Sequence, residues 1–186
     1  MAYLVGRTEL ESVFPPELLV TLDAAVAQGI GHGPTRDFLV RVGLPDKPAA
    51  WFEVSEEICD GEFEIGFEEI ADDHPGLSFD LSRWINLGGL SYDDIALDSS
   101  TGEVYCLPDD GSAPYLLNRS LDAFAYFLYL LEVERPNYDF EAGDGTFEDG
   151  AERRLRARME AADGTAFAHP GSAWTTVLQY VSTKLQ

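Results

Sequence analysis

The residues that carry most enzyme chemistry are few in this chain, and none of them forms a catalytic pattern. The three histidines, His32, His74 and His169, each stand beside Gly or Pro, without HExxH or HxH spacing, so we expect no zinc site. The two cysteines are far apart and form no CxxC pair. Cys106 lies in an apolar run and is predicted to be a small core residue, whereas the acidic residues around Cys59 disfavour its thiolate.

Other familiar motifs are incomplete. The chain has no GxSxG sequence, and Ser172 is predicted to cap a helix. The segment Gly29–Gly33 lacks the Gly-Lys-Ser/Thr ending of a phosphate loop and is interpreted as a turn. The acids of residues 139–150 are spaced almost as in an EF-hand, but Asp144 and Gly150 stand where glycine and glutamate are required. We therefore expect no cofactor and no resident metal ion, while adventitious calcium binding and a catalytic pair among the many carboxylates stay open.

The order of predicted elements indicates the α+β class. Helices are predicted over residues 17–26, 35–42, 121–134, 151–159 and 174–185, and strands near 51–55, 63–67, 84–90, 95–97, 104–107 and 115–117. Short turns between successive strands predict a central, mostly antiparallel sheet flanked by helices. Gly88-Gly89 is expected to mark a bulge or bend, and Asn118 or Ser120 to cap the helix that follows.

Composition and charge narrow the function classes. The 186 residues are 45% apolar, which is enough for a buried core, and we predict one domain over 1–186 with an acidic loop and helix extension at 137–170. The N-terminus has no signal-peptide pattern, and the longest apolar run, 123–131, is shorter than the roughly 20 residues that span a bilayer. With a net charge of −22, a basic face for nucleic acid or anionic lipid would have to come from 12 cations spread along the chain, so such partners are disfavoured. We predict a cytoplasmic protein that binds neither nucleic acid nor membrane; its oligomeric state is left open.

Negative charge is most concentrated between Lys47 and Arg83, where no other cation occurs. Within this segment Phe63, Ile65 and Phe67 alternate with Glu64, Gly66 and Glu68, which predicts a strand with one apolar and one solvated face. Such a surface would attract and steer a basic partner. The alternative interpretation is a solvated face that protects an exposed sheet edge from aggregation.

Four short sequences follow one another along the chain: DFLVRVGLP at 37–45, NLGG at 86–89, IALDSSTGEVY at 95–105 and LNRSLDAF at 117–124. Their order resembles the SUKH superfamily, most closely the SUKH-4 family of bacterial immunity proteins, which are related to the Smi1/Knr4 domain. Trp174 and its apolar helix are similar to the SUKH-4 ending. The resemblance runs from about Thr35 to the C-terminus and is weakest over 137–170. It implies a non-catalytic α+β domain in which Gly43, Gly89 and Gly102 serve turns or close approaches.

The resemblance also implies a partner, namely a cognate toxin that the protein binds and blocks, often a nuclease or a nucleic-acid deaminase. Because such toxins present basic clefts, it favours the interaction interpretation of the acidic residues. The predicted partner is a toxin with a basic surface, neutralised by occlusion. A Smi1/Knr4-like regulatory or scaffold module and an enzyme with a carboxylate site remain alternatives. The predicted contacts are Glu56, Glu57, Asp60, Glu62, Glu64, Glu68, Glu69, Asp72 and Asp73, followed by Asp93, Asp94, Asp109 and Asp110 at two turns.

Overall fold

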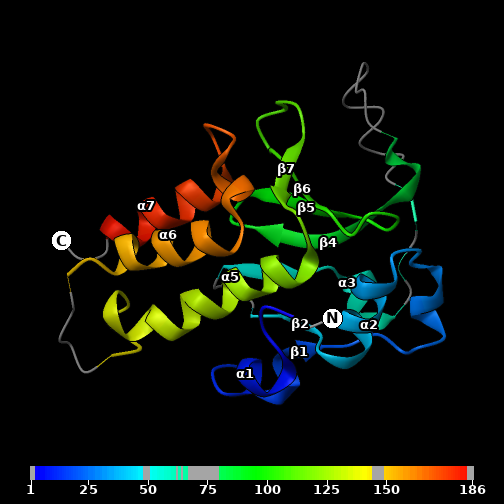
Figure 1. The fold of residues 1–186 in the computed structure, drawn as a ribbon, viewed down its shortest axis with the longest axis horizontal. Coiled ribbons are helices and arrows are strands. Elements are labelled where there is room, and N and C mark those ends of the chain that lie inside the picture. The colour runs from blue at the N-terminus through cyan, green and yellow to red at the C-terminus, as the bar shows by residue number, and fades with distance from the viewer. Residues whose placement is uncertain are drawn as a thin grey trace.

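A five-stranded antiparallel sheet forms the centre of the computed structural model, which describes residues 3–47, 51–61, 63, 65–66, 80–143 and 149–183 (Figure 1). Its strands lie in chain order and are β3 (Phe52–Val54), β4 (Trp84–Leu90), β5 (Asp93–Asp98), β6 (Val104–Leu107) and β7 (Tyr115–Asn118). A second, two-stranded sheet pairs β1 (Leu19–Val20) with β2 (Leu44–Pro45). The predicted α+β class with an antiparallel sheet is confirmed.

Helices flank this sheet. The α-helices in the described residues are α1 (Arg7–Glu11), α2 (Gly33–Arg41), α3 (Glu56–Asp60), α5 (Leu121–Glu134), α6 (Ala151–Ala162) and α7 (Ala173–Thr183). Short 3₁₀ turns are η1 (Pro16–Leu18), η2 (Val26–Gly29), η3 (Leu81–Arg83), η4 (Arg135–Asn137) and η5 (Gly164–Phe167). Figure 1 shows α5 between the sheet and the layer that holds α1, β1 and β2, with α6 and α7 side by side. None of the helices in the described part of the chain has the length and apolar character that a bilayer crossing requires.

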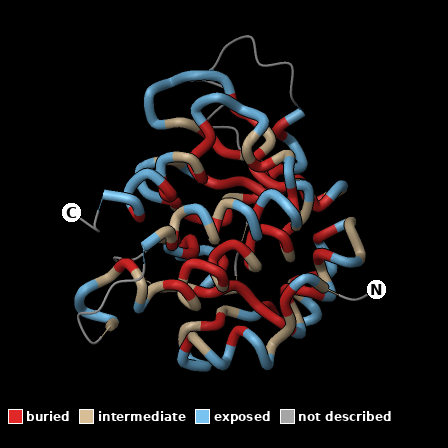
Figure 2. The backbone as a smooth tube through the Cα atoms, turned by 60° about the vertical axis from the view of Figure 1, so that its left-hand side comes forward, coloured by how far each residue is buried: buried red, intermediate tan, exposed pale blue. Residues whose placement is uncertain are grey.

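The main core lies between the sheet and the helices. Phe124 and Phe127 of α5 pack against Trp174 of α7, with ring centroids 5.5 and 5.1 Å apart. Phe124 also meets Phe52 of β3 edge-on at 4.9 Å. Figure 2 shows the buried backbone through the middle of the molecule and the exposed backbone on its outer turns. Burial of these large rings provides much of the free energy of folding.

The opposite face of the sheet carries a smaller apolar cluster. It consists of Trp84, Ala96 and Leu107 with Leu81 of η3, and Tyr105 stacks on Trp84 with centroids 4.5 Å apart. Both faces of the sheet are therefore buried along this part of β4, β5 and β6.

The ends of several elements follow predicted signals. Ser120 caps α5, because its hydroxyl oxygen accepts a hydrogen bond from the backbone N–H of Ala123. Asn118, the other candidate cap, lies instead at the end of β7.

The pairing of β4 with β5 shifts between Asn86 and Gly88, so the predicted bulge is confirmed. Gly88 has a φ of 130°, whereas Gly89 has ordinary φ and open space around it, so the close approach predicted at Gly89 belongs to Gly88.

Two predicted elements are wrong or lie partly outside the described residues. The helix predicted over 17–26 is wrong: η1, β1 and η2 form there instead, because β1 pairs with β2. The Asp23 carboxylate also accepts a hydrogen bond from the backbone N–H of Ala25, which forms a turn. Of the strand predicted over 63–67, Phe63, Ile65 and Gly66 are described and are not in a strand. Ile65 was expected inside, yet it is 42% exposed. The rest of that prediction lies outside the described residues.

Helix α3 was not predicted, although its signals stand in the sequence. The Ser55 hydroxyl oxygen accepts a hydrogen bond from the backbone N–H of Ile58, and Glu56 and Glu57 occupy the first turn, where the helix dipole favours acids. Gly61 ends the helix in the left-handed conformation at φ 72°. A capped five-residue helix is too short to show apolar periodicity, so its pattern was missed.

Candidate protein-binding site

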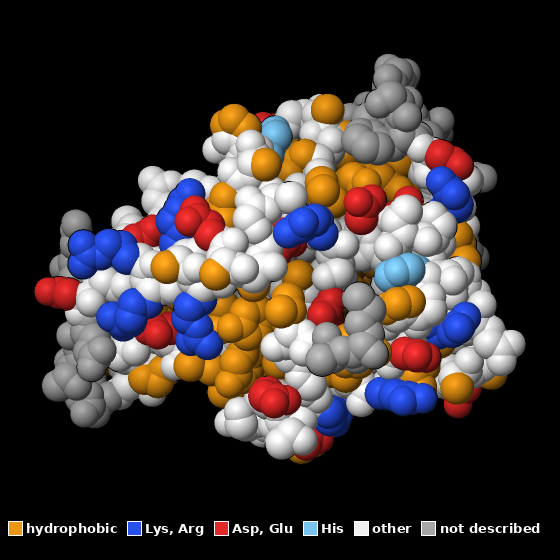
Figure 3. Space-filling model, viewed as in Figure 1, with side chains coloured by type: hydrophobic (Ala, Val, Ile, Leu, Met, Phe, Trp, Pro, Cys, Tyr) orange, Lys and Arg blue, Asp and Glu red, His pale blue; other side chains and the backbone are white. Residues whose placement is uncertain are grey.

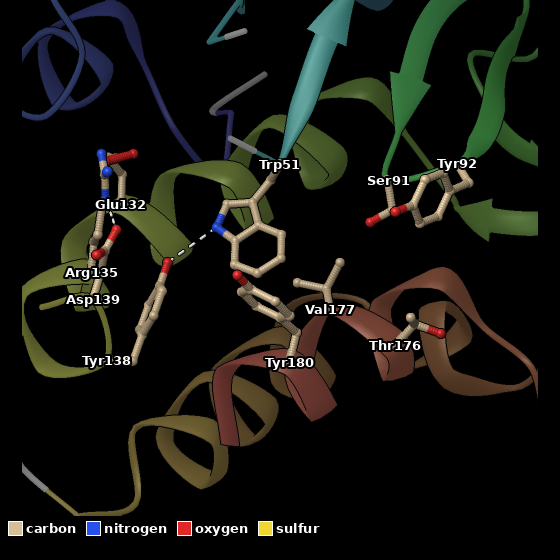
Figure 4. Close-up of a pocket in the computed structure, with 10 residues that line it drawn as sticks. All are labelled: Trp51, Ser91, Tyr92, Glu132, Arg135, Tyr138, Asp139, Thr176, Val177 and Tyr180. Carbon is tan, nitrogen blue, oxygen red and sulfur yellow. Dashed lines mark hydrogen bonds and ion pairs between the residues drawn. The ribbon is translucent and has the colours of Figure 1, made fainter. Parts of the chain in front are cut away.

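A cleft of about 410 Å³ opens at one end of the sheet, beside the entry to β3 and the β4–β5 turn. The residues that line it come from the sheet end, the end of α5 with the turn after it, and α7 (Figure 4). They are Trp51, Ser91, Tyr92, Glu132, Arg135, Tyr138, Asp139, Thr176, Val177 and Tyr180. Thr176 and Tyr180 are four residues apart on α7 and therefore share one helix face.

The indole of Trp51 is fixed at the centre of the cleft. Its Nε1–H donates to the Tyr138 hydroxyl at 3.1 Å, and that hydroxyl donates to the Leu131 carbonyl at 2.9 Å. Tyr180 meets the indole edge-on, with centroids 5.3 Å apart (Figure 4). Burial raises the pKa of Tyr138, so its hydroxyl keeps the proton that it donates. These hydrogen bonds hold the Trp51 and Tyr138 side chains in place in the cleft.

The charged wall of the cleft is internally balanced. Lys47 Nζ lies 2.8 Å from a Glu132 oxygen, and Arg135 bonds Glu132 at 3.0 Å and Asp139 at 2.8 Å. Two cations and two carboxylates alternate in this chain of contacts. They hold the end of α5 to the residues before β3, and their charges sum to zero when Lys47, which stands behind the lining, is counted.

The aromatic side chains at the mouth face solvent. Tyr92, at the tip of the β4–β5 turn, is 89% exposed, and Tyr180 is 48% exposed. Trp51 is half-buried beside them. Clustered tyrosine and tryptophan side chains of this kind are enriched in protein interfaces and among their hot spots.

A second hollow, of about 380 Å³, adjoins the first and shares Tyr92 with it. Its other lining residues are Asp93, Pro108, Asp109, Asp110, Ser112, Tyr115, His169 and Gly171. The register pairs Asp94 with Leu107, which places Asp94 beside the turn that carries Asp109 and Asp110. The structure therefore brings together the four acids predicted at the two turns.

These four carboxylates differ in their surroundings. Partial desolvation, and then the Asp109 and Asp93 carboxylates, raise the pKa of Asp94. The side-chain and backbone hydrogen bonds of Ser112 lower the pKa of Asp110. None of the four makes an ion pair with a Lys, Arg or His of the described residues. This unbalanced negative charge lies directly beside the aromatic cleft.

The remaining predicted contacts do not join this group. Glu56, Glu57 and Asp60 are exposed on α3. Ser55, which precedes α3, bonds the carbonyl of Asn86 near the start of β4, and Leu90 at the other end of β4 pairs with Asp93. These two acidic groups therefore lie toward opposite ends of the sheet. Glu62, Glu64, Glu68, Glu69, Asp72 and Asp73 lie outside the described residues.

Cys106 is buried, as its apolar run predicts, and Cys59 is exposed among acidic residues, while His74 lies outside the described residues. Burial first, and then Asp93, raise the pKa of the buried Cys106 thiol, and partial desolvation followed by Asp46 raises that of Cys59. Both thiols therefore stay protonated at neutral pH. His169 stacks on Tyr115 with centroids 4.0 Å apart. No group of three or more His, Cys, Asp or Glu residues in the described part of the chain is placed to hold a metal ion.

Positive charge is gathered on a different element. Figure 3 shows Lys and Arg side chains grouped over α6. Arg153 and Arg158 are exposed there, and Arg156 pairs with Glu160 and lies over the Phe167 ring at 4.7 Å.

The cleft was not predicted from the sequence. Trp51, Tyr138 and Tyr180 come from three distant segments, and no spacing connects them. Tyr92 carried a signal, because an aromatic residue in a turn between two strands is solvent-facing unless a partner covers it.

Fold and surface together describe an α+β domain with a preformed aromatic cleft and an acidic border, which is the character of a protein-binding module. The chain belongs to the SUKH-4 family: the family model described as SUKH-4 immunity protein matches residues 5–180. This membership supports an immunity-protein role, and it confirms the resemblance seen in the four short motifs. No curated protein and no solved structure matches the chain.

Proposed function

We propose that this protein binds a cognate toxin with a basic surface and neutralises it by covering its active cleft. The toxin in this proposal is a nuclease or a nucleic-acid deaminase, and the protein acts by equimolar binding, not by catalysis. The observation that carries the proposal is the family match over residues 5–180, nearly the whole chain. The raised thiol pKa values, which argue against a cysteine nucleophile, support the non-catalytic part.

The acidic end of the sheet supports the choice of a basic partner. Asp93, Asp109 and Asp110 line one hollow, Asp94 lies beside it on β5, and none of the four has an ion-pair partner among the described residues. Toxins that hold phosphate groups do so with Lys and Arg, and carboxylates can occupy the same cations. The net charge of −22 would also steer such a toxin toward the complex at low ionic strength.

Co-expression tests the proposed role. The partner is sought among the products of the reading frames adjacent to this chain's gene, and each is produced in a bacterial host with and without the chain. We expect the toxin to arrest growth alone, growth to be restored by the chain, and the two to purify as one equimolar complex. Growth arrest that persists, together with separate elution of the two proteins, would contradict the proposal.

Two matched triple variants locate the acidic contact. Replacing Asp94, Asp109 and Asp110 by Asn should weaken toxin binding about tenfold or more at low salt, with a smaller effect at high salt. Replacing Glu56 and Glu57 by Gln and Asp60 by Asn removes the same number of charges at the other end of the sheet and should change affinity much less. The reverse ranking would move the contact to α3.

A further inference from the structure

Three aromatic side chains from separate elements converge on one surface cleft. Trp51 precedes β3, Tyr92 lies in the β4–β5 turn and Tyr180 lies on α7, and all three line the same cavity (Figure 4). Scattered exposed aromatics are ordinary on protein surfaces, but a group of them around one cleft marks an interaction site. The Trp51–Tyr138 hydrogen bond fixes the Trp51 indole in advance, which reduces the entropy that this side chain loses on binding.

The chemistry of the cleft favours an apolar occupant. Glu132 and Asp139 already hold Lys47 and Arg135, so a charged side chain that entered would lose hydration without meeting an unbalanced charge. An apolar side chain loses no hydrogen bonds there and covers the exposed rings.

A small polar ligand fits less well. Such ligands are oriented by a few converging polar groups that bond them. Among the described residues, no buried side-chain nitrogen or oxygen lacks a hydrogen-bond partner. In the cleft, the Trp51 indole and the Tyr138 hydroxyl bond each other, and Arg135 bonds Glu132 and Asp139, so these polar groups are already engaged with protein atoms.

The surface beside the cleft favours cations. Tyr92 borders both the aromatic cleft and the hollow that Asp93, Asp109 and Asp110 line. A partner seated on Tyr92 would thus meet a neutral aromatic surface on one side and unpaired carboxylates on the other.

We propose that the Trp51–Tyr180 cleft receives one apolar side chain from a segment of the partner protein, while lysine or arginine residues of that segment contact the carboxylates across Tyr92. The inference rests on the proposed function, since the partner is the toxin. The apolar anchor supplies most of the affinity, and the charges supply attraction and orientation.

Two substitutions test the cleft with little risk to the fold. Tyr92→Ala removes an aromatic ring that is 89% exposed. Thr176→Trp fills the cleft from an exposed position on α7. The matched control is Ser182→Trp, an equal change at an exposed position of the same helix that does not line the cleft. Circular dichroism and thermal melting establish that each variant is folded.

Binding calorimetry with the purified toxin from the co-expression test then measures the affinity of each variant. We expect Tyr92→Ala and Thr176→Trp each to weaken binding about tenfold or more, with Ser182→Trp within about twofold of the native chain. The salt dependence of binding should stay as in the native complex, because neither change removes a charge.

The failures of the two proposals are distinguishable. If the native chain binds the toxin and both cleft variants bind it equally well, the cleft proposal is overturned and the proposed function stands. If the native chain neither binds nor rescues, the proposed function fails and this inference falls with it. If the cleft variants change only the self-association of the chain in gel filtration, a second copy occupies the cleft and the proposal is likewise overturned.

Discussion

At the scale of single residues, the most buried polar contacts join β7 to the two C-terminal helices. Asp163, which is 1% exposed, accepts hydrogen bonds from the Asn118 side chain at 3.2 Å and the Arg119 backbone at 2.8 Å. Its other oxygen accepts from Arg119 Nε and from the Thr165 hydroxyl. Asn118 in turn accepts from the Trp174 indole at 2.9 Å. Every member of this network is satisfied, which is the condition for a buried polar group to stabilise a fold.

This network makes Asp163 a site of acid sensitivity. Burial works to raise the pKa of Asp163, but the hydrogen bonds from Thr165, Arg119 and Asn118 outweigh it and lower the pKa. A carboxyl group with a lowered folded pKa stabilises fully above the ordinary Asp pKa of about 4, and this stability is lost as pH falls through the folded value. Asp163→Asn should cost about 3 kcal/mol at neutral pH, measured by urea unfolding, and less at acid pH.

Asp37→Asn serves as the control for Asp163, because Asp37 is exposed on α2. It should change the free energy of unfolding by about 0.5 kcal/mol or less at any pH. Equal effects of the two substitutions would show that the buried network contributes nothing to stability.

At the scale of elements, the β4 bulge depends on one glycine. Gly88 has φ 130°, a region that side chains rarely adopt, and a Cβ there would overlap the backbone of Glu53 on β3 and of Ser55 just after it. Gly88→Ala should therefore lower stability by about 3 kcal/mol or more, or prevent folding, since β3 must move away from β4.

The neighbouring glycine provides a matched control. A Cβ at Gly89 would find its nearest atom, the Asp93 carbonyl oxygen, at 4.0 Å, and its φ is ordinary. Gly89→Ala should change the urea midpoint little, by about 1 kcal/mol or less in free energy. If both variants unfold at the same midpoint, the backbone argument for the bulge is wrong.

Long or well-punctuated elements were predictable from the sequence, and short ones were not. The helix α5 has a Ser cap and fourteen residues of which eleven are apolar, and the strands β5 and β6 flank a clear turn. The segment 17–26 has helical spacing of Leu and Val, but tertiary pairing of β1 with β2 overrides it. Local pattern cannot report such a pairing, because the partner strand stands more than twenty residues away.

The candidate site was predictable in part, for a similar reason. Acids at turns are visible in sequence, and Asp94 and Asp109 do meet in space because β5 and β6 are joined by a tight hairpin. The aromatic cleft needs Trp51, Tyr138 and Tyr180 to be brought together by the packing of α7 against the sheet end. That meeting depends on the whole fold, so no single stretch of sequence could indicate it.

At the scale of the whole molecule, binding and stability make opposite demands on charge. The helix α6 carries Arg153, Arg154, Arg156 and Arg158, a third of the 12 cations in the chain. The acids around Asp94 are left without ion-pair partners among the described residues. Like charges held close together destabilise a fold, yet the same field attracts a basic partner. The acidic border is therefore expected to reduce the stability of the unbound protein.

Two carboxylates of this acidic border, Asp94 and Asp110, allow the effect of charge on stability to be separated from its effect on binding. The raised pKa of Asp94 means that its ionisation opposes folding, so the penalty is absent below the ordinary Asp pKa and is complete above the raised, folded value. Asp94→Asn should therefore raise the thermal midpoint at neutral pH, by about 0.5 kcal/mol or less in free energy, and have no such effect near pH 3, below the ordinary Asp pKa of about 4. Asp110 has a lowered pKa because of Ser112, so Asp110→Asn should not raise the midpoint at neutral pH.

Calorimetric melting of both variants at the two pH values measures these changes in stability. Toxin binding by Asp94→Asn should weaken while the stability of this variant rises. A loss of stability at neutral pH in Asp94→Asn would mean that this carboxylate supports the fold, and the opposition between stability and binding would not hold at this position.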